Sequence, residues 1–259
     1  MSGETAAALP GLAGAVNVAV GARATARIAR AALTSLSALG EARIVGHYYP
    51  GAQAHSLAQA LRELCAIHAI EVDVRGMFPD RPCVLVANHL SYLDPLVILA
   101  QKPAAPVAKA EVAGWPMIGP AARALGVNFV DRASIPRRAV TLRRAITALR
   151  AGVSVLNFPE GTTTRGNRIL PFHRGIFGAA ILAEVPVVPI ALTYEDRDLA
   201  WTDNATFLPH YWRFSTLPRV RARLVVRSPM WARPTEEPAD FAARVRAAIA
   251  LSLDGHLRA

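Results

Sequence analysis

The chain is poor in cysteine and lysine, and each shortage narrows what the protein can be. Its 259 residues include two cysteines, Cys65 and Cys83, which show neither CxxC spacing nor a nearby pair of histidines. This pattern argues against a zinc site and suits a reducing cytoplasmic setting. Lys102 and Lys109 are the only lysines, so arginine carries almost all of the net charge of +10. A basic protein favours an anionic partner: nucleic acid, an acidic carrier protein or anionic lipid headgroups.

Several motifs that would define other enzyme classes are also missing. The sequence contains no Walker A motif and no dinucleotide-binding fingerprint. Gly152-x-Ser154 lacks the second glycine of a nucleophile elbow. No recognised nucleic-acid-binding module accompanies the positive charge, which argues against nucleic acid as the partner. Residues 1–22 carry only Glu4 as a charged side chain and lack the basic start of a secretory signal.

The first 50 residues read as a helical segment that associates with a membrane. Residues 5–22 are uncharged but include Pro10, Asn17 and three glycines, so a membrane span is only one interpretation. In the next stretch three arginines recur at helical spacing, while apolar residues share another face: Arg23, Arg27 and Arg30 against Ile28, Ala32, Leu33 and Leu36. Such a helix suits a membrane interface, or it packs on its own domain as a solvated helix.

Residues 51–259 are expected to form the main domain. Apolar, β-branched runs at 70–75, 83–87, 106–108, 127–130, 153–158 and 187–193 alternate with helical patterns at 93–102, 116–125, 134–150 and 174–184. This alternation predicts an α/β fold with a layered, mostly parallel sheet flanked by helices. A helical pattern at 53–67 precedes the first of these strands. The alternating stretch RVRARLVVRSPM at 219–230 predicts a sheet-edge strand with one solvated face. Residues 236–254 predict a closing helix.

The stretch VANHLSYLD, residues 86–94, places a histidine five positions before an aspartate, directly after an apolar run. Helix capping explains part of it, with Ser91 as the N-cap and Asp94 favouring the helix N-terminus. Catalysis explains it equally well, because ligands bind outside the carboxyl ends of strands in parallel α/β sheets. Asp94 would then hold one nitrogen of His89 and leave the other to accept a proton.

Four stretches resemble, in order, the motifs of the glycerolipid acyltransferases, the family that includes 1-acyl-sn-glycerol-3-phosphate acyltransferase. They are NHLSYLD at 88–94, GVNFVDR at 126–132, FPEGT at 158–162 and VPVVPI at 185–190. The resemblance covers roughly residues 70–195. It implies transfer of a fatty acyl chain from acyl-CoA or acyl carrier protein (ACP) to the hydroxyl of a lysophospholipid, most simply 1-acylglycerol 3-phosphate, with no metal or other cofactor.

The resemblance also assigns roles to single residues. It implies that His89 is the general base and Asp94 its orienting partner. Thioester donors are already activated, so one oriented base suffices for attack by the alcohol. The acceptor's phosphate and glycerol would be bound by Arg132, Glu160, Gly161, Thr162, Lys109 and Arg165. The sequence departs from the family here, because Thr163-Thr164-Arg165 follows the third motif where many relatives have Arg-Ser or Thr-Ser.

Two further segments have alternative interpretations. The helical pattern at 134–150 has five arginines and no acidic residue, which suits ACP, the phosphates of coenzyme A or an anionic bilayer. The aromatic stretch at 201–212 predicts either a lid or lipid-facing loop, or a packed loop. The sequence thus predicts an acyltransferase on the cytoplasmic face of a membrane, with no oligomeric state indicated. A lyso-ornithine lipid as acceptor, hydrolysis in place of acyl transfer, and a non-catalytic membrane-binding protein are the alternatives.

Overall fold

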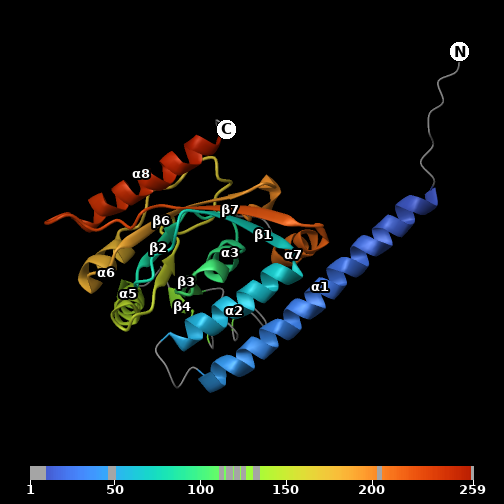
Figure 1. Ribbon diagram of the computed structural model, residues 1–259, viewed down its shortest axis with the longest axis horizontal. Coiled ribbons are helices and arrows are strands. Elements are labelled where there is room, and N and C mark those ends of the chain that lie inside the picture. The colour runs from blue at the N-terminus through green and yellow to red at the C-terminus, as the bar shows by residue number, and fades with distance from the viewer. Residues whose placement is uncertain are drawn as a thin grey trace, which may run out of the picture.

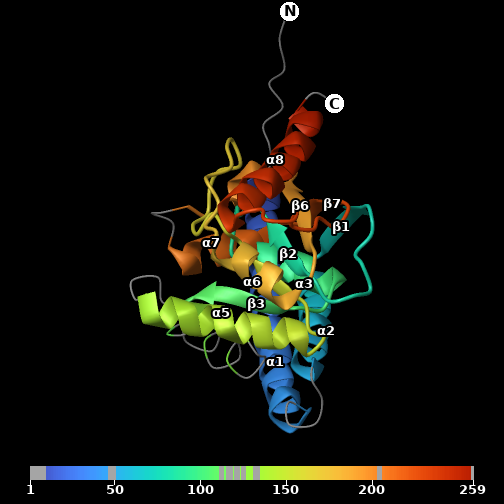
Figure 2. The same cartoon turned by 90° about the vertical axis from the view of Figure 1, so that its left-hand side faces the viewer.

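A seven-stranded sheet with helices on both faces forms the centre of the protein (Figures 1 and 2). The computed structural model describes residues 10–45, 51–110, 127–130, 135–202 and 206–257, together with Gly114, Gly119 and Arg123. The strand order is β1-β7-β6-β2-β5-β3-β4. In chain order the strands are β1 (Ile70–Arg75), β2 (Val84–Ala87), β3 (Ala105–Lys109), β4 (Asn128–Val130), β5 (Val155–Asn157), β6 (Val187–Tyr194) and β7 (Val220–Val226).

The sheet is mostly parallel, which confirms the predicted α/β class. Strands β6, β2, β5, β3 and β4 all run in one direction. Strand β7 is antiparallel to β6, and β1 pairs parallel to β7. All four residues of β2 are buried, as expected of a strand covered on both faces.

The prediction that β7 is an edge strand is wrong. β7 lies inside the sheet between β6 and β1, and its outward side chains alternate with buried ones. Arg221 and Arg223 lie on a part of the sheet face that is open to solvent, whereas Ala222 and Leu224 are buried on the other face. The alternating pattern therefore reports one solvated face, which an interior strand also has when no helix covers it.

Helices form two layers, one on each face of the sheet. One hydrophobic core joins the sheet to α1 (Pro10–Val45), α2 (Ala52–Ile67), α3 (Asp94–Gln101) and α7 (Phe207–Thr216). The other core joins it to α5 (Ile135–Arg150), α6 (Gly175–Ala183) and α8 (Pro238–Leu257). The helices predicted at 53–67, 93–102, 134–150, 174–184 and 236–254 are thus confirmed to within a few residues, and the one predicted at 116–125 falls largely outside the described residues.

The N-terminal segment is one continuous helix, α1, that lies alongside α2 (Figure 1). Ala24, Ala31 and Ala38 are buried at seven-residue spacing, so small side chains form the face that packs on the domain. The guanidinium of Arg27 donates hydrogen bonds to the carbonyls of Ser215, Leu217 and Pro218, at and just beyond the C-terminal end of α7.

These contacts hold part of the predicted N-terminal appendage against the main domain, while the boundary near residue 50 stays a prediction. Among the helical residues that the structure describes, no helix has the length and apolar character needed to cross a bilayer.

Candidate active site

The predicted site residues follow neighbouring parallel strands. His89 lies two residues after the end of β2, and Glu160 lies three residues after the end of β5. Because β2 and β5 are paired in parallel, both residues lie at the same edge of the sheet, where their strands end. The short helix α3 begins at Asp94 and completes the group. The structure therefore brings His89, Asp94 and Glu160 together, as the sequence predicts.

The carboxylate of Asp94 is the centre of this arrangement. One oxygen, Oδ2, accepts hydrogen bonds from His89 Nδ1 at 2.7 Å and from the backbone N–H groups of Leu90 at 2.6 Å and Ser91 at 2.9 Å. Asp94 is fully buried. A buried carboxylate must be paired and hydrogen-bonded, and these donors meet that requirement.

The expected N-cap role of Ser91 is wrong, because α3 begins at Asp94 with Leu93 in the capping position and without a side-chain cap. The hydroxyl of Ser91 is buried and has no hydrogen-bond partner within the described part of the chain. Asp94 itself satisfies the backbone N–H groups of residues 90 and 91. The stretch before the helix is therefore shaped by the aspartate side chain and not by a serine cap.

This geometry fixes the state of the His89 imidazole. An ionised carboxylate accepts hydrogen bonds only, so Nδ1 carries the proton in the contact with Asp94. In the neutral ring, Nε2 then has a free lone pair that can accept a proton. The His89 side chain is 20% exposed, so part of the ring is accessible from solvent. It also stacks on Phe158, with ring centroids 4.2 Å apart, which holds the ring plane.

Tyr194 completes the Asp94 contacts, and sequence reasoning missed it. Its hydroxyl donates to the second oxygen, Oδ1, at 2.9 Å. Burial, and then the charge of Asp94, raise the pKa of Tyr194 well above its usual value, so the hydroxyl stays protonated and remains a donor. Tyr194 is the last residue of β6, the strand beside β2. The only signal in the sequence is a polar aromatic residue at the end of a buried strand.

Asn88 fixes the point where the loop that carries His89, residues 88–93 (the catalytic loop), leaves the sheet. Its side-chain oxygen accepts the N–H of Leu192 at 2.8 Å, and its side-chain nitrogen donates to the carbonyl of Leu192 at 3.0 Å. Asn88 is buried and follows directly after β2. The amide thus imitates a backbone pair and extends the contact between β2 and β6 by one step. This anchors His89, the next residue.

Glu160 is engaged with the protein backbone. Its Oε1 accepts the N–H of His89 and its Oε2 accepts the N–H of Leu170, both at 2.8 Å. Burial raises the pKa of Glu160, and the hydrogen bonds from Leu170 and His89 oppose this shift. The side chain therefore ties the His89 backbone to the loop at 159–174. Its expected contact with a substrate hydroxyl stays a prediction.

The turn after Glu160 lies beside His89. Gly161 has a φ of 81° and donates its N–H to the carbonyl of Phe158, which closes a tight turn that favours glycine. The N–H of Thr164 donates to the carbonyl of His89 at 2.8 Å. Thr162 and Arg165 are exposed on either side of this contact. Their contact with the acceptor stays a prediction.

Two predicted anion-binding residues are not placed by the structure. Lys109 is the last residue of β3, which puts its backbone at the same edge of the sheet, but its side chain is outside the description. Arg132 lies outside the described residues. Their roles in binding the acceptor stay predictions.

Aromatic residues of the 201–216 region cover the catalytic loop. The hydroxyl of Tyr92 and Nδ1 of His210 are 2.9 Å apart, and the Tyr92 ring packs edge-on against Phe207. The N–H of Trp201 donates to the carbonyl of Leu90. The described residues of this segment are therefore packed, but from Phe207 on they form α7, so the prediction of a loop is wrong there. Leu208 and Trp212 nevertheless remain exposed on the outside of α7.

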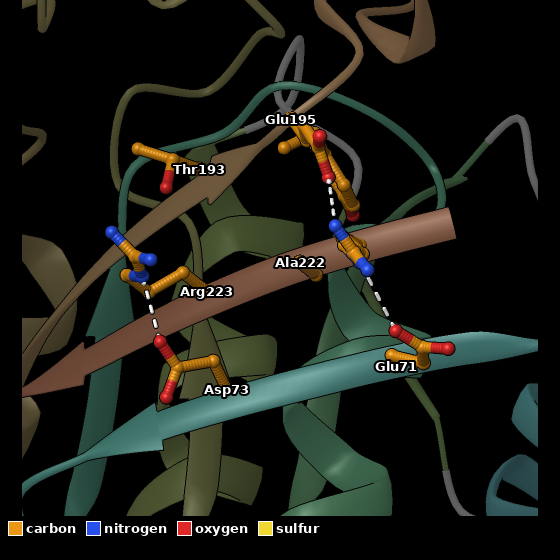
Figure 3. A pocket seen from close by; sticks show the side chains of 8 residues that line it. Glu71, Asp73, Thr193, Glu195, Ala222 and Arg223 are labelled. Atoms are coloured by element: carbon orange, nitrogen blue, oxygen red, sulfur yellow. Dashed lines mark hydrogen bonds and ion pairs between the residues drawn. The ribbon is translucent and has the colours of Figure 1, made fainter. Parts of the chain in front are cut away.

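A polar hollow on the open part of the sheet is a separate feature (Figure 3). Its charged side chains pair with one another: Arg223 with Asp73 at 2.8 Å, and Arg221 with Glu71 at 3.2 Å and Glu195 at 3.4 Å. Thr193 and Tyr194 both line the hollow, but the Tyr194 hydroxyl reaches Asp94. Among the described residues, no group of three or more acidic, histidine or cysteine side chains is placed to hold a metal ion.

Comparisons with known proteins match the part of the chain that carries this site. The family model described as Acyltransferase matches residues 69–193, a span that contains His89, Asp94 and Glu160. A lyso-ornithine lipid O-acyltransferase of Pseudomonas aeruginosa is 32% identical over 216 residues, which cover 80% of this chain and 83% of that protein.

Other relatives are named for a different activity. A 1-acyl-sn-glycerol-3-phosphate acyltransferase of Neisseria meningitidis is 30% identical over 68% of this chain and 71% of that protein. The human 1-acyl-sn-glycerol-3-phosphate acyltransferase alpha is 39% identical, but the match covers 50% of this chain and only 48% of the human protein. The crystal structure of the 1-acyl-sn-glycerophosphate (LPA) acyltransferase PlsC from Thermotoga maritima shares the fold, with a TM-score of 0.61 at 21% identity over 90% of this chain and 98% of that one.

The contact between Tyr194 and Asp94 predicts a defect in Tyr194→Phe. The variant leaves one oxygen of a buried carboxylate without its donor, so we expect kcat for the enzyme's reaction to fall about tenfold while KM changes little. Tyr211→Phe is the matched control, because it removes a hydroxyl that contacts His68 and not Asp94. Steady-state kinetics of both variants test this; equal losses of kcat in the two would contradict a positioning role for Tyr194.

The two backbone contacts of Glu160 predict that Glu160→Gln is more damaging than a surface change of the same kind. An amide accepts one N–H but turns its own donor toward the other, which leaves a buried N–H unpaired and costs about 1–3 kcal/mol. We expect a lower free energy of unfolding and a lower kcat. Urea unfolding and kinetics, with the exposed Glu63→Gln as control, check this; a variant indistinguishable from that control would refute it.

Proposed function

This chain belongs to the acyltransferase family, and we propose that it transfers a fatty acyl chain from a thioester donor to the free hydroxyl of a lysolipid. The single observation that carries the proposal is the His89–Asp94 contact, which leaves Nε2 of an oriented, reachable imidazole as the proton acceptor. We place 1-acylglycerol 3-phosphate first among the acceptors, in line with the activity for which the Neisseria relative is named. Lyso-ornithine lipid is the second candidate, because the relative from Pseudomonas matches over a larger share of this chain.

The proposed reaction needs one proton relay. Nε2 of His89 accepts the proton of the acceptor hydroxyl as its oxygen attacks the thioester carbonyl carbon. The tetrahedral intermediate then collapses, the C–S bond breaks, and the imidazolium returns the proton to the departing thiolate. Asp94 stabilises the imidazolium in between, at the 2.7 Å contact with Nδ1. The products are the acylated lipid and the free thiol of coenzyme A or ACP, and no further cofactor takes part.

The acceptor's headgroup would be bound on the side of His89 that the loop after Glu160 approaches. Arg165 and Thr162 are exposed there, and Lys109 is the last residue of β3, which ends at the same edge of the sheet. Arg132 is proposed to join them on the strength of its motif. Arginine and lysine are suited to a phosphate or carboxylate headgroup. Arg165 is the exposed arginine of this loop nearest to Glu160, and we expect it to contact the acceptor's headgroup.

Membrane association is proposed through the outer face of α1. Val18, Leu33 and Leu36 are 73%, 67% and 55% exposed, although each is a large apolar side chain. Arg23 and Arg30 are exposed beside them. An apolar stripe with flanking arginines suits a helix lying in a membrane interface, with the arginines at the headgroups. The buried alanines and Arg27 would keep the domain attached to that helix, on the cytoplasmic face where donors are available.

The activity is tested by incubating the purified protein with a panel of lysolipids and with acyl-CoA and acyl-ACP donors, and identifying products by mass spectrometry. His89→Ala removes the proposed base, so we expect at least a hundredfold loss of kcat. His55→Ala, a change at an exposed histidine that contacts the Gly51 carbonyl, is the control and should stay active. Acyl transfer retained by His89→Ala contradicts the mechanism, and free fatty acid without acylated lipid means a hydrolase.

Membrane docking is tested separately by removing the exposed leucines. Leu33→Ser combined with Leu36→Ser should lower binding to vesicles of phosphatidylcholine and phosphatidylglycerol by about tenfold or more, because apolar burial in the interface is lost. Met77→Ser removes an apolar side chain that is 86% exposed elsewhere and should bind normally. Sedimentation with vesicles measures this, and unchanged binding of the double variant would rule out this face of α1.

A further inference from the structure

The outer face of α5 is strongly basic. Its exposed side chains include Arg137, Arg138, Arg143, Arg144 and Arg150, and the helix contains no acidic residue. Its inner face is apolar and packs into the second core through Ala145 and Leu149. The apolar residues of the helix therefore pack into the core, and its arginines face solvent. Figure 2 shows α5 lying across the outside of the molecule, next to α6.

Three of these five arginines have no ion-pair partner in the described part of the chain. Arginines elsewhere form ion pairs, such as Arg244 with Glu236 at 2.7 Å and Arg213 with Asp198 at 2.9 Å. Among the residues that the structure describes, Arg138, Arg143 and Arg144 have no carboxylate partner. Like charges on neighbouring turns of a helix repel one another. An anionic partner that covers this face would relieve that repulsion.

The basic surface continues along the loop at 165–174, which leads to the catalytic loop. The first residue of α6, Gly175, lies so close to Leu142 of α5 that a Cβ atom on the glycine would be 3.2 Å from the leucine side chain. Arg174, directly before it, is exposed, and so are Arg168 and Arg165 earlier in the same loop. That loop reaches His89 through the N–H of Thr164. A partner seated on α5 is therefore next to the segment that leads to the proposed base.

The composition of this face argues against a bilayer as the partner. A peripheral membrane helix inserts an apolar face, but on the outside of α5 the large apolar residue that is exposed is Val140, at 45%. The apolar stripe of α1 lies on the other layer of the molecule, across the sheet from α5. The two surfaces are therefore chemically different and separate, which suits a lipid partner on α1 and a water-soluble one on α5.

The extent of the charge argues against a nucleotide. From Arg137 to Arg150 the helix rises about 20 Å, and α5 carries no aromatic side chain on which an adenine could stack. We propose that α5 is the docking surface for an acidic acyl carrier protein, which delivers its thioester to His89 past the loop at 165–174. This inference rests on the proposed acyl transfer and names the donor that the site receives. Charge complementarity of this kind mainly governs the association rate and the choice of partner.

The test compares donors of the same acyl chain length in neutral detergent micelles, so that vesicle binding does not enter. Arg143→Glu combined with Arg144→Glu should raise KM for acyl-ACP about tenfold or more, leave kcat unchanged, and leave both constants for acyl-CoA within about twofold. Wild-type KM for acyl-ACP should also rise with ionic strength. Arg219→Glu combined with Arg227→Glu is the matched control, with the same change of net charge at exposed arginines outside α5.

Several outcomes would overturn the inference. Equal losses with both donors would assign the arginines to the fold or to a phosphate shared by the donors, and thermal unfolding of the variant separates these two. An equal rise in KM for acyl-ACP in the control pair would mean that the net charge of the whole protein, and not a docking site on α5, causes the effect. Unchanged kinetics in micelles, together with weaker sedimentation of the variant with anionic vesicles in a separate assay, would make α5 a lipid surface. Wild-type protein that accepts acyl-CoA alone refutes the carrier inference and leaves acyl transfer standing, whereas no transfer from either donor refutes the proposed function itself.

Discussion

The buried carboxylate of Asp94 is the constraint on which the rest of the site depends. It accepts hydrogen bonds from His89, Leu90, Ser91 and Tyr194, which come from the loop after β2 and from the end of β6. A buried carboxylate is stable only when such donors surround it, so the positions of the loop, α3 and β6 are fixed relative to one another. The surrounding contacts add to this order: Asn88 fixes the start of the loop, Glu160 holds the His89 backbone, and Phe158 supports the ring. The imidazole is thereby left with one nitrogen for chemistry.

The fold was predictable from sequence wherever local pattern determines structure. Buried strands such as β2 and β6 appear as short apolar runs, and α5 and α8 follow clear helical periodicity. The position of β7 was not predictable in the same way, because alternation reports a solvated face and says nothing about which strand lies alongside. The start of α3 also differs from the expectation at Ser91, because the Asp94 side chain accepts the N–H groups of Leu90 and Ser91 and holds this stretch outside the helix.

The sequence predicted only those site residues that lie within its motifs. His89 and Asp94 stand in one short stretch, so their contact follows from a strand, a loop and a helix in succession. Tyr194 comes from a hundred residues later in the chain, and only the pairing of β6 with β2 brings it to Asp94. Glu160 was expected to face a substrate hydroxyl, but its oxygens accept two backbone N–H groups, which are donors that no side-chain pattern reveals. The same site is flanked by two unlike surfaces, an apolar one on α1 and a basic one on α5, which matches a reaction whose substrates come from lipid and from water.

The central claim is that Asp94 fixes the tautomer of His89, and nitrogen NMR of protein labelled at histidine tests it most directly. At a pH where the ring is neutral, the account predicts that the His89 signals, identified by their absence in His89→Ala, show a protonated Nδ1 and an unprotonated Nε2. In Asp94→Asn this preference should be lost or reversed. A proton on Nε2 in the wild-type protein would contradict the account, because that nitrogen could not then accept the proton of an attacking hydroxyl.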